Sequence, residues 1–107
     1  MYLSRLDKDV RRSPREEVSW QTHVNAPAMP PAEVLIVNLS PSGCMVRSDA
    51  RLTPGDRITL FLPTIREIEA QVMWALGGRA GIEFDKPLAL PSYSAILSEM
   101  QRDDGMR

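Results

Sequence analysis

The sequence predicts a mainly β fold, all-β apart from one helix: a six-stranded antiparallel β-barrel followed by a C-terminal α-helix. Six short segments either alternate apolar with polar residues or run apolar throughout, as strands do. Turn residues separate these segments at intervals of about 8 to 12 residues, which is typical of small barrels and sandwiches. Because closure removes the exposed edges of a sheet, we expect the six strands to close into a barrel.

The expected strands follow one another with short connections. They cover residues 17–24, 32–39, 44–48, 57–62, 65–76 and 80–84. In the first of them, Val18, Trp20, Thr22 and Val24 alternate with polar residues, which indicates a half-buried strand. Residues 25–31 contain three prolines and are expected to end that strand.

The fifth strand is long, and its alternation assigns an inner and an outer face. Ile68, Ala70, Val72 and Trp74 fall on one face, opposite a face of mostly polar residues. The pattern therefore favours packing in the core as the role of Trp74.

The last segment has helical spacing. Its apolar positions are Tyr93, Ile96, Leu97 and Met100, with Ser92 as a possible N-cap and Pro91 ahead of it. We thus divide the chain into an N-terminal arm (1–16), a barrel (17–90) and a C-terminal helix (91–103).

Length and charge limit what the chain can do. Its 107 residues and 12.0 kDa suffice for one domain with one core. With 13 Lys and Arg against 14 Asp and Glu, the net charge is -1, which argues against a general attraction to nucleic acid or anionic membrane. There is no apolar leader and no stretch long enough to span a membrane, so we expect a cytoplasmic protein without membrane insertion.

Side chains suited to catalysis or metal binding are scarce. The chain has one cysteine, Cys44, within an apolar strand where packing is its expected role, and one histidine, His23, on the polar face of a strand. A Ser or Cys nucleophile would lack a nearby base, and no set of cysteines and histidines could hold zinc. We expect no catalytic residues, no metal and no cofactor, and hence a binding protein rather than an enzyme.

Two stretches carry chemistry suited to binding. The arm holds Arg11, Arg12 and Arg15, whose planar guanidinium groups match phosphate oxygens and the O6/N7 edge of guanine. Taken alone, such a cluster is more often a solvated tail. The second stretch, residues 38–43 (NLSPSG), crowds small polar residues and a glycine between two apolar strands, which predicts a turn shaped for an occupant or for its own backbone geometry.

Together the two stretches resemble the two-part signature of the PilZ domain family. Arg11 and Arg15 match its Arg-x-x-x-Arg part, and Asn38, Ser40 and Gly43 match its Asn-x-Ser-x-x-Gly part. The likeness extends through the LTPGD turn and the last two strands, over about residues 8–98.

The resemblance implies a bacterial receptor for the second messenger cyclic di-GMP, with a role in motility or biofilm regulation. Family analogy assigns ligand binding to Arg11, Arg12, Arg15, Asn38, Ser40 and Gly43, and Trp74 resembles an aromatic position that contacts the base in some members. Binding would order the arm and so signal to a protein effector, which the sequence does not identify. The chain could act as a monomer or a homodimer.

Two other interpretations stay open. A PilZ-like adaptor would use the same fold for protein interaction without nucleotide, and residues 38–43 would then only satisfy a turn. A barrel that binds single-stranded nucleic acid would need a basic groove with interleaved aromatic residues, which this neutral chain does not supply.

Overall fold

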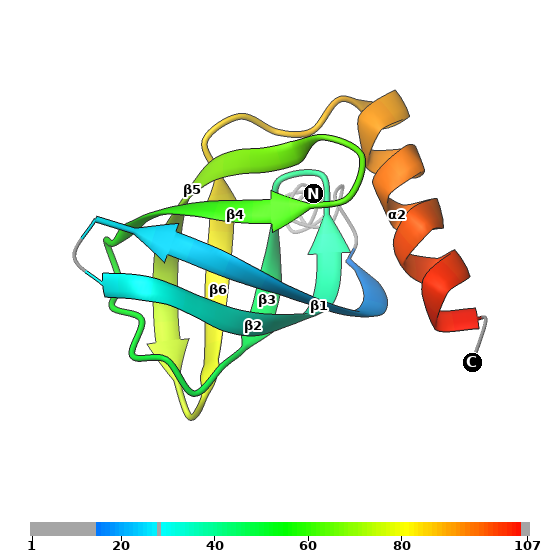
Figure 1. Cartoon of the computed structure of the whole chain (residues 1–107). Helices are drawn as coiled ribbons and strands as arrows, with labels where there is room; N and C mark the ends of the chain where they lie inside the picture. The colour runs from blue at the N-terminus through cyan, green and yellow to red at the C-terminus, as the bar shows by residue number, and fades with distance from the viewer. Residues whose placement is uncertain (1–14, 28, 106–107) are drawn as a thin grey trace, which may run out of the picture.

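The computed structural model describes residues 15–27 and 29–105, and it has the predicted architecture: six strands and a C-terminal helix (Figure 1). The strands are β1 (Glu16–Ala26), β2 (Met29–Ser40), β3 (Gly43–Arg47), β4 (Arg57–Leu62), β5 (Arg66–Leu76) and β6 (Arg79–Phe84), and the helix is α2 (Leu90–Gly105). The predicted fold class, a six-stranded antiparallel barrel with one helix, is confirmed.

All strand pairs are antiparallel, and the sheet closes in the order β1-β2-β3-β6-β5-β4. The closing seam between β1 and β4 is the shortest ladder, with only Val24 opposite Leu60 and Asn25 opposite Thr59. Beyond the ladder, the Thr22 hydroxyl donates to the Phe61 carbonyl at 2.7 Å. The barrel is therefore closed, but few ladder pairs connect β1 to β4.

The core fills the barrel with the inward-facing apolar residues that the alternation predicted. The fully buried large side chains from the strands include Val24, Val34, Ile36, Leu39, Val46, Ile58, Leu60 and Val72. Cys44 is also fully buried, as expected for a packing role, and burial raises the pKa of its thiol to about 12. The thiol therefore stays protonated near neutral pH.

The proline segment between β1 and β2 behaves differently from the prediction. Residues 25–31 do not all lie outside the strands, because β1 continues to Ala26 and β2 begins at Met29. Val24 pairs with Ala32 and Ala26 with Met29, so β2 holds one extra residue between those pairs. This bulge contains the exposed Pro30 and Pro31, whose missing N–H groups a ladder interruption tolerates.

The helix packs its predicted apolar face on the barrel, and Figure 1 shows it beside one end of the strands. Ile96 and Met100 are fully buried, and the Tyr93 hydroxyl donates to the Leu39 carbonyl at 3.3 Å. Ser92 is not the N-cap, because α2 already begins at Leu90. Pro91 thus lies in the first turn, where a helix needs no N–H from it.

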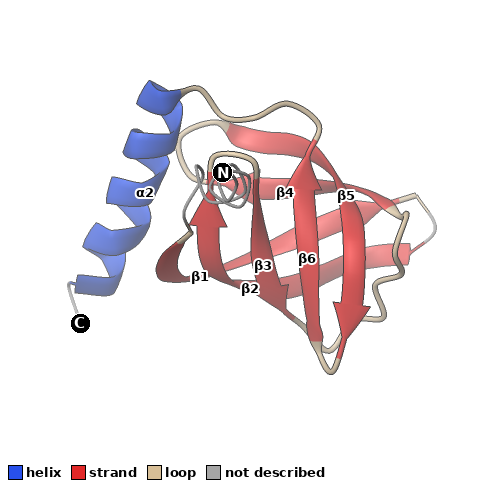
Figure 2. Ribbon diagram, turned by 180° about the vertical axis from the view of Figure 1, so that it is seen from behind, coloured by secondary structure: helices blue, strands red, loops and turns tan. Residues whose placement is uncertain are grey.

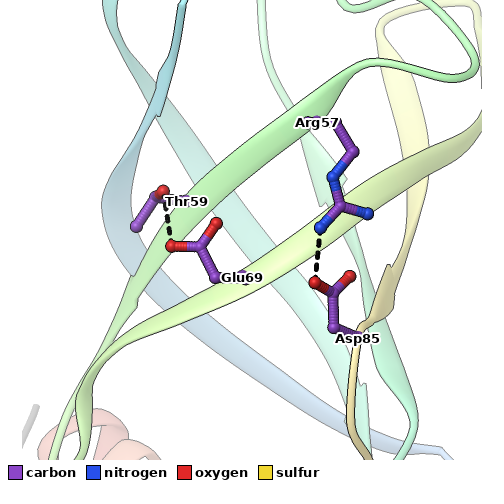
Figure 3. Close-up of polar contacts among 4 residues, drawn as sticks. All are labelled: Arg57, Thr59, Glu69 and Asp85. Carbon is purple, nitrogen blue, oxygen red and sulfur yellow. Dashed lines mark hydrogen bonds and ion pairs between the residues drawn. The ribbon is translucent and has the colours of Figure 1, made fainter.

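Side-chain contacts also tie the outer surface together around β4 and β5. Arg57 of β4 forms an ion pair with Asp85, just after β6, and the Thr59 hydroxyl donates to a Glu69 carboxylate oxygen at 3.2 Å (Figure 3). Both contacts connect neighbouring strands. Because they are exposed to solvent, they contribute little to the stability of the sheet.

Candidate functional site

A β-bulge in β2 decides which way Asn38 points. Ile36 pairs with Val46 but Asn38 pairs with Met45, so Val37 is an extra residue on the β2 side. Without the bulge Asn38 would share the inward face of Ile36, since side chains two apart lie on the same side of a strand. The extra residue instead turns Leu39 into the core and Asn38 to the outer surface.

A second bulge does the same for Trp74 in β5. Val72 pairs with Ile82 and Trp74 with Gly81, which leaves Met73 as the extra residue. Val72 is fully buried whereas Trp74 is 43% exposed. The prediction that Trp74 packs in the core is therefore wrong, because a strict two-residue alternation does not hold across the bulge.

The two bulges place both side chains in one row across four strands. In register, Asn38 lies opposite Met45, Met45 opposite Gly81 and Gly81 opposite Trp74. A Cβ atom on Gly81 would lie 2.1 Å from the Trp74 indole nitrogen, so the indole rests directly on the glycine backbone. Gly81 thereby fixes the indole against the outer surface of β6.

Arg15 is the one arginine of the predicted motif within the described residues, and it joins this row. Its Nη1 donates to Asn38 Oδ1 at 3.0 Å, which links the two halves of the signature across 23 residues of sequence. The side chain is exposed. One of the five N–H donors of the guanidinium serves this bond, and no other described residue accepts a hydrogen bond from the remaining four.

The turn between β2 and β3 is tighter than residues 38–43 suggested. Only Pro41 and Ser42 lie between the strands. Ser40 is 1% exposed, and its hydroxyl donates to the Gly43 carbonyl at 3.3 Å, so in this structure it holds the turn from inside.

Gly43 allows β3 to approach β6. A Cβ atom on it would lie 2.1 Å from the Ile82 carbonyl oxygen, and the neighbouring Phe84 N–H donates to the Ser42 carbonyl at 2.9 Å. A glycine is therefore needed at this position for the two backbones to pack closely, whether or not it also contacts a ligand.

A shallow hollow of about 200 Å³ lies next to these side chains. It is lined by Arg15, Ser42, Gly43, Met73, Trp74, Gly81, Ile82 and Glu83. The hollow therefore brings Arg15, Gly43 and Trp74 together, and Asn38 is connected to it through its hydrogen bond with Arg15. Sequence reasoning missed Met73 and Glu83, because an exposed carboxylate and an exposed methionine on a strand carry no motif.

Two arginines of the predicted site, possible metal ligands and possible membrane spans still have to be considered. Arg11 and Arg12 lie outside the described residues. Within residues 15–27 and 29–105, no group of three or more His, Cys, Asp or Glu side chains could hold a metal ion. No helix in the same part of the chain has the length and apolarity to cross a membrane.

The fold and the hollow together define a small β-barrel domain with a hollow on its outer surface. The family model of the PilZ domain matches residues 9–100, most of the chain, so the protein belongs to the PilZ family, as the sequence resemblance indicated. PilZ domains are generally cyclic di-GMP-binding domains, and they are receptors or adaptors rather than enzymes. A comparison with curated proteins found no matching sequence.

Proposed function

We propose that this chain is a cyclic di-GMP receptor whose binding site is the hollow beside Arg15 and Trp74, completed by Arg11 and Arg12 from the arm. The observation that carries the proposal is the hydrogen bond between Arg15 and Asn38, because it joins the two halves of the family signature at one place. Binding then changes how the arm is held against the barrel, and a protein effector reads that change.

The guanidinium groups of the proposed site suit the ligand's phosphates. The remaining N–H donors of Arg15 form a planar fork that can bind a phosphate bidentately. Asn38 holds this fork in place through its side-chain oxygen. Arg11 and Arg12 supply further guanidinium groups for the second phosphate or a guanine edge.

The rest of the hollow suits a guanine base. The Trp74 indole presents an exposed face on which a purine can stack, a contact that contributes about 1–3 kcal/mol per base in other nucleic-acid complexes. Glu83 places a carboxylate on the same hollow, where it can accept a hydrogen bond from the guanine amino group. In this proposal Ser40 and Gly43 act by shaping the β2–β3 turn that borders the ligand.

Titration calorimetry with cyclic di-GMP tests the proposal. We expect the wild-type chain to bind the nucleotide, and Arg15→Ala to weaken binding by about tenfold or more, since it removes a charge-assisted hydrogen bond. Trp74→Ala should weaken binding by a similar factor, and Trp74→Phe by less. Because Arg15 and Trp74 both lie on the surface, all three variants should stay folded, which circular dichroism checks.

Arg102→Ala is the matched control, because Arg102 is an exposed arginine far along α2 whose only described ion pair is with Glu99 of the same helix. Its affinity should equal that of the wild type. If the folded wild-type chain takes up no cyclic di-GMP at high micromolar concentration, the receptor proposal is wrong and the adaptor interpretation replaces it.

A further inference from the structure

A pair of arginines lies on the outer surface of the barrel at the other end of β3 and β6 from the nucleotide hollow. Arg47 ends β3, Arg79 begins β6, and the two are directly opposite in register. Gly43, at the hollow, is four residues away along β3, which corresponds to roughly 13 Å. In Figure 2 the β5–β6 turn next to Arg79 is at the bottom, and the β2–β3 turn is at the top.

This arrangement of charge is unfavourable for the fold itself. Side chains directly opposite in an antiparallel pair lie on the same face with Cβ atoms about 5 Å apart, so two guanidinium groups there repel each other. Both arginines are exposed, and neither takes part in the ion pairs found among the described residues. Within the described part of the chain, no side chain or backbone group is hydrogen-bonded to their guanidinium N–H donors, which an anion from outside can therefore use.

Apolar side chains flank the arginine pair on both sides. Leu35 of β2 lies opposite Arg47, and Leu76 of β5 lies opposite Arg79, so the four residues form one row across the sheet. Leu35 is half-buried, whereas Leu76, the last residue of β5, is 79% exposed. The row therefore combines two cations with apolar surface.

The row borders an open hollow of about 910 Å³, much larger than the one at Trp74. Besides Leu35, Arg47 and Arg79, its lining includes the carboxylates of Glu33 and Asp49. These two negative charges disfavour a multiply charged phosphate ligand or nucleic acid. A single carboxylate placed between the arginines, with apolar neighbours on the leucines, carries one charge only and is repelled less.

We propose that Leu35, Arg47, Arg79 and Leu76 form a docking surface for an acidic segment of a partner protein. An Asp or Glu side chain of that segment binds between the two guanidinium groups, and apolar side chains next to it contact the two leucines. Recognition must work through side chains here, because the closed barrel offers no free strand edge for an added strand.

Nuclear magnetic resonance titration of the uniformly ¹⁵N-labelled full chain tests this surface. The probes are the acetylated and amidated peptide Leu-Asp-Leu-Glu-Leu, its neutral counterpart Leu-Asn-Leu-Gln-Leu, and inorganic phosphate. We expect the acidic peptide to shift the amide signals of residues 33–35, 47–49 and 76–80, and the neutral peptide and phosphate to leave them in place. Arg47→Gln and Arg79→Gln should each weaken binding about five- to tenfold.

Two controls make the result specific. Arg102→Gln removes an exposed arginine elsewhere and should bind the peptide as the wild type does. Arg47→Gln should be at least as stable as the wild type in urea, because it removes a repulsion, and its affinity for cyclic di-GMP should not change, so this surface and the nucleotide site are tested separately.

Several results would overturn the docking surface. They are an absence of signal shifts with the acidic peptide at millimolar concentration, equal shifts with the neutral peptide, tighter binding of phosphate than of peptide, and a clear loss of stability in Arg47→Gln. The last result would mean that the arginines serve the fold.

Discussion

Replacing Gly43 with alanine should destabilise the barrel, because the new Cβ atom has no room. It would lie 2.1 Å from the Ile82 carbonyl oxygen and 3.2 Å from the Glu83 Cα atom, and both are backbone atoms that cannot rotate away. A carbon and a carbonyl oxygen approach to about 3.3 Å at closest, so β3 and β6 would have to separate by roughly 1 Å.

That separation stretches hydrogen bonds beyond their useful range. The bond from the Phe84 N–H to the Ser42 carbonyl is 2.9 Å long, and the Gly43–Glu83 ladder is next to it. We expect the loss of about two backbone hydrogen bonds, at about 1 kcal/mol each, together with the strain of the displaced strands. Alanine also stiffens the unfolded chain, which offsets part of this cost. The free energy of unfolding should therefore fall by about 2–3 kcal/mol.

Urea denaturation of wild type and Gly43→Ala measures this loss. Gly77→Ala is the matched control, because nothing lies within 4 Å of a Cβ atom there, and its φ of 61° should cost only about 1 kcal/mol. A Gly43→Ala variant that is as stable as the wild type but no longer binds cyclic di-GMP would refute the packing argument. It would show that the glycine serves the ligand directly.

Three further predictions concern the helix and the core. Ile96→Ala should lower the free energy of unfolding by about 2–4 kcal/mol, because Ile96 is fully buried, whereas Leu90→Ala, at a position 69% exposed, should change it by less than about 0.5 kcal/mol in the same urea titration. Tyr93→Phe removes the hydrogen bond to Leu39 and should cost about 1 kcal/mol; an unchanged urea midpoint would mean that the bond contributes nothing. Because burial raises the pKa of the Cys44 thiol from 9.0 to about 12, the folded chain keeps a proton that the unfolded chain loses above pH 9. Stability should therefore fall by about 1 kcal/mol between pH 8 and pH 10, and a Cys44→Ala variant with the same pH dependence would contradict this cause.

The strands and the core could be predicted from the sequence because most residues obey a two-residue alternation. Val24, Ile58 and Val72 are all buried as that alternation requires. It fails for Trp74, because the inserted residue of the bulge, Met73, is as apolar as an ordinary strand residue and so leaves no trace in the pattern. The proline segment was misjudged for a related reason, since a bulge can hold residues that a regular ladder excludes.

The candidate site was predicted from its motif rather than from its geometry. The motif identified Arg15 and Asn38, and the structure brings them within hydrogen-bonding distance. It did not indicate that Ser40 would face inward, because a buried and an exposed serine look alike in sequence. The docking surface could not be predicted at all, since Arg47 and Arg79 become neighbours only through the pairing of β3 with β6.

The short seam between β1 and β4 has a consequence for how the barrel moves. Only two ladder pairs connect β1 to β4, whereas β1 shares a long ladder with β2 on its other side. Brief local opening should start at this seam, and amide hydrogens near Asn25 and Thr59 should exchange with solvent sooner than those of β3. Arg15, which donates to Asn38, lies immediately before β1, so a ligand bound to it should also slow this opening at the other end of the strand.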